Sequence, residues 1–442
     1  VCTASEQCPS LFECVEGFCE HKSVLPLTQR ELIGSILIVL LGGLAQAGGM
    51  GGGFIITPML VTIFKYDPVP AIRLVYGMIF GGAIGNYLNT ALSKDPKSQK
   101  PLINYDVSLI CVPLLICGSS LGVIVKSWIP PIGTITCLFM LTVRALLKLY
   151  TRAQKAYAQE TATRTTQVQK QEIELKDQQA RSPAVNLSPE YEEHLLILNS
   201  PTTRHFLMED RIQFPWKRYK EFIVLLLTII VMLVLRGSKT LPSVIGVEFC
   251  TTGYWVLYVI ALSICFYFGN RGKNILTEET EAQQAAFLDT NPAHQKMKFS
   301  SEQISSLMNV SLIAGILAGM LGIGGGMIIG PMLIDMGMNG QEVTATSGFF
   351  IIFTSFISLF QTLVSGELIL IDTLYFSLLT AVGAYVVSWF LKYLVEKYKR
   401  PSLMLFSLCS AIMLGIIIMP FYTVIRTMQD PKVIFGFGSL CQ

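Results

Sequence analysis

The chain has 442 residues, of which 52% are hydrophobic and 14% charged, and its mean hydropathy is +0.54. A soluble protein of this size cannot bury so much apolar surface, so the composition excludes that class and predicts an integral membrane protein. The formal net charge is only +3, and the Lys and Arg residues are concentrated between the apolar runs. Nucleic-acid binding is therefore not indicated.

A cysteine cluster opens the chain and defines a first region, residues 1–25. It contains Cys2, Cys8, Cys14 and Cys19. We expect these to form disulfides in an oxidising compartment, with three pairings possible and a zinc site as the alternative. Their spacing is similar to that of small EB-type extracellular modules. Because the sequence starts without Met or an apolar leader, we expect that a signal peptide has been removed and that the amino terminus faces the outside or a lumen.

Two apolar runs are interrupted by nearly the same glycine-rich sequence. The first reads Gly49-Met-Gly-Gly-Gly-Phe-Ile-Ile-Thr-Pro-Met-Leu60, and the second, 273 positions later, reads Gly322-Ile-Gly-Gly-Gly-Met-Ile-Ile-Gly-Pro-Met-Leu333. Non-helical backbone is tolerated inside a bilayer only where it is buried in protein or lines a wet cavity. Paired broken segments in two halves of a chain indicate the binding site of a transporter.

Uninterrupted apolar runs predict the remaining spans. They cover residues 72–92, 105–125, 131–150, 222–235, 254–268, 345–363, 370–391 and 403–422. The first broken run, residues 33–64, is too long for one straight crossing and too short for two. If it crossed once, the cationic loop 151–220 would lie on the same side as the cysteine cluster, against the positive-inside rule.

A re-entrant hairpin that turns at 48–53 resolves this conflict and places the cationic loops inside. The same reasoning makes the second broken run, about 308–336, a hairpin that enters from the cytoplasm. The predicted fold is thus an all-α polytopic membrane protein with two inverted repeats. Its regions are the module 1–25, repeat 1 at 33–150, a cytoplasmic helical linker at 151–221, a connecting helix pair at 222–268, a cytoplasmic loop at 269–305, repeat 2 at 306–422 and an outer tail at 423–442.

The linker begins with residues 151–181, which lack Pro and Gly and are rich in Gln, Glu, Lys and Ala. They predict a cytoplasmic helix that continues the preceding span. A sparse stripe on it could contact a protein partner, although a solvated charged helix is the alternative. The stripe consists of Tyr157, Thr161, Arg164, Val168 and Leu175.

Both glycine-rich segments resemble the TauE/SafE family of sulfite exporters and related anion permeases, in its eukaryotic branch. The resemblance lies in Gly324-Gly325-Gly326 with Pro331, Thr346-Ser347 and Thr354-Ser355, and in Gly51-Gly52-Gly53 with Thr57-Pro58. It implies transport of a small anion of the sulfite, sulfate or organosulfonate class. One departure is Val75-Tyr76, where family members tend to carry a small polar pair such as Ser-Lys.

Backbone amides at the glycine-rich turns could bind an anion without a cationic side chain, because Gly permits sharp turns and half-helix N-termini are electropositive. The candidate substrate-binding residues are Gly51, Gly52, Gly53, Thr57, Gly324, Gly325, Gly326, Thr346, Ser347, Gln46, Arg73, Asn86, Thr354, Ser355 and Gln361. Arg73 could be a bidentate anion ligand or could extend to the membrane interface. Alternatively, the glycines serve close helix packing and the hydroxyls bond to their own helices.

An enzymatic function is not expected. The four histidines, His21, His194, His205 and His294, lie outside the apolar runs, and no metal site or cofactor is indicated. Asp335 could couple transport to protons, but a cytoplasmic surface charge is the simpler interpretation. We therefore expect an alternating-access transporter of a small anion in the plasma membrane or an endomembrane. The alternative is a non-transporting structural subunit that keeps the fold.

Overall fold

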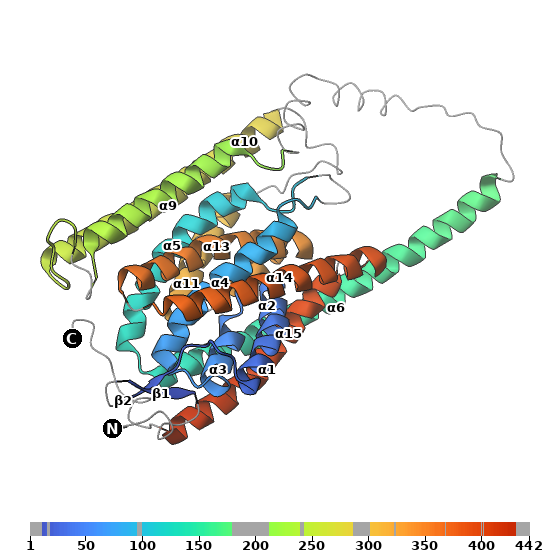
Figure 1. Cartoon of the computed structure of the whole chain (residues 1–442). Coiled ribbons are helices and arrows are strands. Elements are labelled where there is room, and N and C mark those ends of the chain that lie inside the picture. Colours follow the sequence, from blue (N-terminus) through green and yellow to red (C-terminus); the bar gives the residue numbers. More distant parts are fainter. Residues whose placement is uncertain are drawn as a thin grey trace.

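The computed structural model describes residues 11–15, 18–94, 100–178, 212–238, 243–285, 301–321, 324–366, 368–398, 400 and 402–429, and not every side chain within them. It confirms an all-α polytopic membrane protein (Figure 1). Within the described residues, six helices are long and apolar enough to cross a membrane. They are Gln29–Ala47, Tyr105–Val125, Thr252–Glu278, Glu302–Met320, Gly340–Val364 and Leu370–Tyr398.

The amino-terminal half begins with a helical arm that breaks at the first glycine cluster. The arm consists of α1 (Gln29–Leu37), the π-helix η2 (Ile38–Gly42) and α2 (Gly43–Ala47), and after the break the chain continues as α3 (Gly53–Thr62). The helices α4 (Pro68–Thr90), α5 (Tyr105–Trp128) and α6 (Pro131–Gln178) follow. The Arg30 guanidinium donates a hydrogen bond of 2.8 Å to Thr62 O, so the two ends of the broken segment are adjacent. This segment is a hairpin.

The carboxy-terminal half repeats this order after two connecting helices. The connecting pair is α9 (Trp216–Arg236) and α10 (Thr252–Ala285), which pack on each other and on α5 along one edge of the bundle (Figure 1). Then come α11 (Ser301–Leu321), α12 (Gly326–Asp335), α13 (Gly340–Val364), α14 (Leu370–Tyr398) and α15 (Ser402–Gln429). The second break therefore falls between α11 and α12.

A small β-hairpin precedes the helices, formed by β1 (Phe12–Val15) and β2 (Phe18–His21) in an antiparallel pair that places Cys14 opposite Cys19. Cys2 and Cys8 lie outside the described residues, so the disulfide pairing of the amino-terminal cluster stays a prediction. Cys250 is disulfide-bonded, and its partner is not among the described side chains. The five cysteines inside the apolar runs are free thiols.

One end of the bundle, which we call the Tyr66 end, is organised around the carboxylate of Asp372. This side chain is 2% exposed and accepts hydrogen bonds from Tyr66 Oη (2.6 Å), Val24 N (3.1 Å) and Ser23 Oγ (3.4 Å). The His21 ring stacks on Tyr66. The amino-terminal segment, the α3–α4 loop and the start of α14 therefore lie together.

The opposite end, which we call the Tyr219 end, brings together described residues that flank the loops that the sequence analysis placed inside. Arg218 pairs with Asp106 at 2.9 Å, and Lys392 Nζ donates to Ser93 Oγ at 3.0 Å. Further along this end, the carboxylate of Glu160 accepts hydrogen bonds from Ser402 N and Oγ. The described cationic residues Arg218 and Lys392 thus lie at one end of the protein.

Glycines bring pairs of helices into backbone contact. Along α5 and α11, Gly118, Gly122, Gly315 and Gly319 face the partner helix so closely that an added Cβ would overlap its backbone or nearly touch it. Gly77, Gly81 and Gly85 give α4 the same close approach to α14. In a bilayer, where apolar surface gains little from leaving lipid, such small-residue contacts supply much of the association energy.

Two regions differ from the sequence-based prediction. Residues 269–285, predicted as loop, continue α10 as helix, and α11 begins at Ser301 rather than near 306. The predicted extension of the third span is confirmed, because α6 is continuous through Gln178. Two residues of the stripe predicted to contact a protein partner instead contact Arg400 of the same chain. The Arg400 guanidinium lies 4.2 Å from the centroid of the Tyr157 ring and donates a hydrogen bond to Thr161 Oγ1.

We predict that Gly319→Ala destabilises the protein by about 1–3 kcal/mol, because its Cβ would overlap the backbone of Ser119. Gly330→Ala is the matched control on α12, where an added Cβ meets only Val343 Cγ1 at 3.6 Å. Helix propensity alone favours Ala over Gly at both sites. Thermal unfolding in detergent compares them, and equal midpoints for the two variants would contradict backbone contact between α5 and α11.

Candidate functional site

The first glycine-rich turn is held in shape by left-handed backbone and by one buried amide. Gly49, Gly51 and Gly52 have φ values of +72°, +82° and +72°, a region that side chains with a Cβ rarely adopt. Gln46 is 1% exposed, and its Nε2 donates to Gly51 O at 2.8 Å and to Ile79 O at 3.2 Å. The Gln46 amide is therefore committed to fixing the turn.

The second turn is built in a related way. Gly324 has a φ of +67°, and α12 starts two residues later, while residues 322–323 lie outside the described residues. Gly325 is buried against Leu115 of α5, which would overlap any added Cβ. Both turns thus lead directly into the N-terminus of a ten-residue helix, α3 or α12.

The two turns contact each other inside the protein. A Cβ on Gly326 would overlap Gly49 O, and one on Gly324 would lie 3.7 Å from both Gly51 Cα and Met50 O. Residues 48–53 are buried throughout. The two glycine clusters therefore lie in one place in the fold, and their backbones approach to van der Waals distance.

Two buried polar groups beside this contact have no hydrogen-bond partner. Ser347 is 2% exposed, its Cβ lies next to Gly49 and Gly326, and its Oγ is unsatisfied. Asn86 is 1% exposed, its Oδ1 accepts from Ser388 Oγ at 2.8 Å, and its Nδ2 is unsatisfied. That Nδ2 lies against Gly348, the residue after Ser347, at 2.7 Å from the position of an added Cβ.

An unsatisfied buried donor costs about 1–3 kcal/mol, so two of them beside the contact between the glycine turns require an explanation. Both are neutral donors, and two half-helix N-termini converge on the same place. Hydroxyl, amide and helix N-terminus are groups that bind a small anion without a counter-ion. Among the described residues, no cluster of three or more His, Cys, Asp or Glu side chains could hold a metal ion.

Other candidate residues have structural partners. Thr346 Oγ1 accepts a hydrogen bond from Asn104 N at 3.0 Å, and Thr57 Oγ1 donates to Gly53 O at 2.8 Å. Thr354 and Ser355 donate to carbonyls of their own helix, as the alternative interpretation expected. Gln361 and Arg73 are half-buried on α13 and near the start of α4.

Asp335 forms ion pairs with Lys148, at 2.9 Å, and with Arg152, both on α6. Its carboxylate therefore anchors the end of α12 to the neighbouring helix. This arrangement agrees with a surface charge and leaves Asp335 without a place in the glycine site.

Aromatic hydrogen bonds that the sequence analysis did not identify lie toward both ends of the protein. Toward the Tyr66 end, burial and the hydrogen bond to Asp372 raise the pKa of Tyr66, so the phenol remains a donor at physiological pH. Toward the Tyr219 end, Tyr219 Oη lies 2.8 Å from Tyr87 Oη and 3.0 Å from Tyr105 Oη. Because these partners come from distant parts of the sequence, no local pattern could have indicated them.

This combination of membrane helices, twin broken hairpins and a buried polar site is that of a membrane transporter. The family described as "Sulfite exporter TauE/SafE" matches residues 212–432, half of the chain, and the protein belongs to that family. Members of the family are transporters rather than enzymes, as the sequence analysis expected. No solved structure shows significant similarity to the chain.

Curated relatives in Arabidopsis thaliana are similar over nearly the whole chain. The sulfite exporter TauE/SafE family protein 2 is 25% identical over 416 residues, which cover 92% of this chain and 86% of the relative. Family protein 5 is 23% identical over 407 residues, which cover 92% of this chain and 86% of the relative. Family protein 3 is 24% identical over 415 residues, which cover 93% of this chain and 83% of the relative. The similarity therefore extends well beyond the residues 212–432 that the family matches.

We predict that Gly326→Ala separates the two turns and abolishes transport, since its Cβ would overlap Gly49 O. Gly330→Ala, one turn further along α12, is again the control because an added Cβ there meets only Val343 Cγ1, at an ordinary contact distance of 3.6 Å. Uptake in proteoliposomes, normalised to folded protein, measures the effect. Wild-type uptake by a correctly folded Gly326→Ala protein would show that contact between the turns is not needed.

Proposed function

We propose that the protein is a secondary transporter that carries a small oxyanion of the sulfite, sulfate or organosulfonate class by alternating access. The observation that carries the proposal is the pair of unsatisfied buried donors, Ser347 Oγ and Asn86 Nδ2, beside the two glycine turns. The relatives in Arabidopsis thaliana are named as sulfite exporter family proteins, which supports the substrate class. The turns, Ser347 and Asn86 together form the proposed anion site.

The site favours a compact oxyanion over a cation on chemical grounds. Its unsatisfied groups are an O–H and an N–H₂, both of which can donate, and the nearby N-terminal ends of α3 and α12 carry positive partial charge. None of the residues that form it is acidic. An oxyanion could satisfy several donors at once, which a neutral apolar substrate could not.

Reciprocal packing of the two halves supports the inverted repeats. The arm of the first hairpin packs on α14, where Gly43 faces Gly383, and the arm of the second, α11, packs on α5. Each hairpin arm thus lies on a full-length helix of the other half. The two halves could therefore rotate relative to each other around the proposed anion site.

The hydrogen bond of Tyr66 at one end and those of Tyr219 at the other could act as closures of the proposed anion site, which suggests how access alternates. Release of Tyr66 from Asp372 would open the Tyr66 end, and separation of Tyr219 from Tyr87 and Tyr105 would open the other. The structure has both closures formed, which is the arrangement expected of an occluded state. In a transporter, only one closure opens at a time.

We further propose that the Tyr66 end, with the amino-terminal module 1–25, faces the outside or a lumen, and that the Tyr219 end is cytoplasmic. The cationic residues Arg218, Lys392 and Arg400 at or near the Tyr219 end support this orientation. The membrane in question is the plasma membrane or an endomembrane.

We predict that Ser347→Ala weakens sulfite binding by roughly tenfold to a hundredfold, because a hydroxyl that bonds a buried anion contributes about 1–3 kcal/mol. Thr354→Ala is the matched control, since that residue is also buried on the same helix but its hydroxyl bonds to Phe350 O and Ile351 O. Binding by calorimetry and sulfite flux in proteoliposomes both report the effect.

Equal affinity for the Ser347→Ala and wild-type proteins would remove this hydroxyl from the site. If the wild type shows no flux in vesicles where the folded protein is present in a known orientation, the alternative of a non-transporting structural subunit is favoured instead. Binding without flux would separate a retained site from a lost transport cycle.

A labelling experiment tests the orientation. Cys250 lies between α9 and α10, so we predict that a membrane-impermeant maleimide labels it in intact cells after reduction, and that Cys250→Ser lowers the labelling. Lys397→Cys, an exposed position near the other end of α14, should be labelled only after permeabilisation. The opposite pattern for these two positions would invert the proposed orientation.

A further inference from the structure

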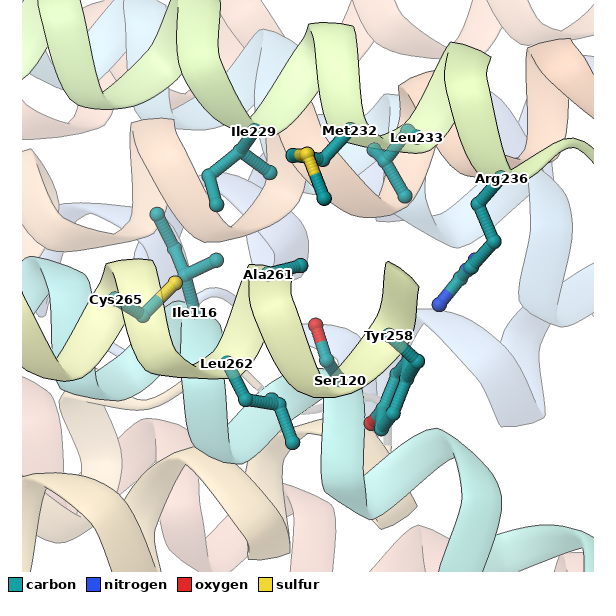
Figure 2. Close-up of a pocket in the computed structure, with 10 residues that line it drawn as sticks. All are labelled: Ile116, Ser120, Ile229, Met232, Leu233, Arg236, Tyr258, Ala261, Leu262 and Cys265. Atoms are coloured by element: carbon teal, nitrogen blue, oxygen red, sulfur yellow. The ribbon is translucent and has the colours of Figure 1, made fainter. Parts of the chain in front are cut away.

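A pocket lies outside the two hairpins, between α5, α9 and α10 (Figure 2). Its wall is largely apolar and is formed by Ile116, Ile229, Met232, Leu233, Ala261 and Leu262. Ser120, Tyr258 and Arg236 supply polar groups at one side. The pocket is separate from the proposed anion site and is formed in part by the connecting helix pair.

Arg236 and Tyr258 carry unsatisfied groups in this pocket. Tyr258 is 5% exposed and its Oη has no hydrogen-bond partner, and the buried Nε of Arg236 also lacks one. The Arg236 guanidinium lies 5.0 Å and 5.1 Å from the ring centroids of Tyr254 and Tyr258. Among the described residues, no carboxylate pairs with Arg236, and Glu248 in the adjoining loop is exposed. Within the described residues, the Arg236 guanidinium is thus a cation without a paired anion.

The location of the pocket points to a lipid. Arg236 is the last residue of α9, and the loop that follows exposes Val244 (73%) and Ile245 (56%). Val231, Val256 and Val259 on the same two helices are also exposed, as residues that face acyl chains would be. A cation at a helix end beside such a surface lies where lipid headgroups meet the hydrocarbon.

We propose that this pocket binds an anionic lipid. Arg236 and Tyr258 donate hydrogen bonds to its phosphate, and one acyl chain lies along the apolar wall between α9 and α5. Arg is suited to this role because its guanidinium binds phosphate through two hydrogen bonds while stacking on aromatic rings. The bound lipid would join the connecting pair to α5, whose Leu115 contacts the second glycine turn and whose Ile116 lines this pocket.

The test is lipid binding by the purified full chain, measured by native mass spectrometry and by the rise in unfolding temperature. We expect phosphatidylglycerol to bind and stabilise, and phosphatidylcholine and inorganic phosphate not to do so. Arg236→Gln should weaken phosphatidylglycerol binding by about tenfold or more, and Tyr258→Phe by less. Arg400→Gln is the matched control, because that guanidinium also lies over a tyrosine ring, that of Tyr157, near the other end.

If Arg236→Gln and Arg400→Gln weaken phosphatidylglycerol binding equally, the binding reflects general charge attraction, and the proposed lipid site is overturned. Arg236-dependent stabilisation by phosphate alone would overturn the lipid as its occupant, and equal binding of phosphatidylcholine would overturn its selectivity for anionic headgroups. If Arg236→Gln fails to fold, Ala261→Phe, which fills the pocket without removing a charge, replaces it. Undiminished phosphatidylglycerol binding by that variant would also contradict the proposal.

Discussion

Backbone polar groups at the middle of a membrane protein must find partners without water, and this constraint governs the centre of the fold. The two glycine turns meet it together. Gln46 bonds to Gly51 O, and Gly326 lies so close to Gly49 O that no Cβ fits between them. Each turn therefore helps to bury the other inside the protein.

The proposed anion site follows from this arrangement, but its donors are not symmetric. Ser347 comes from α13 of the second half and Asn86 from α4 of the first, and they do not occupy equivalent positions in the two repeated sequences. The position of the first half that corresponds to Ser347 is Leu74, which is buried in an apolar cluster. The loss of a polar pair at Val75-Tyr76 therefore does not leave the site without donors, because Asn86 supplies one from further along the same helix.

Most of the fold could be predicted from the sequence because membrane helices are encoded locally. Each of the six described helices that could cross a membrane contains an apolar run of the sequence, and the Gly and Pro residues marked the two hairpins. Which hydroxyls are free could not be predicted, because that depends on neighbours distant in sequence. Thr346 and Ser347 are adjacent and chemically alike, yet Asn104 N occupies one and nothing among the described residues occupies the other. The Tyr66–Asp372 bond and the Tyr219 cluster are long-range contacts for the same reason.

The central claim is that an oxyanion binds beside the two glycine turns, at Ser347 Oγ and Asn86 Nδ2. The most direct test is the position of selenite, a heavier analogue of sulfite, located by its anomalous scattering in crystals of the full chain. The account predicts a selenium peak beside Gly49 and Gly326, with selenite oxygens in hydrogen-bond reach of Ser347 Oγ and Asn86 Nδ2. A selenium peak found only elsewhere, at a concentration that blocks sulfite flux, would contradict it.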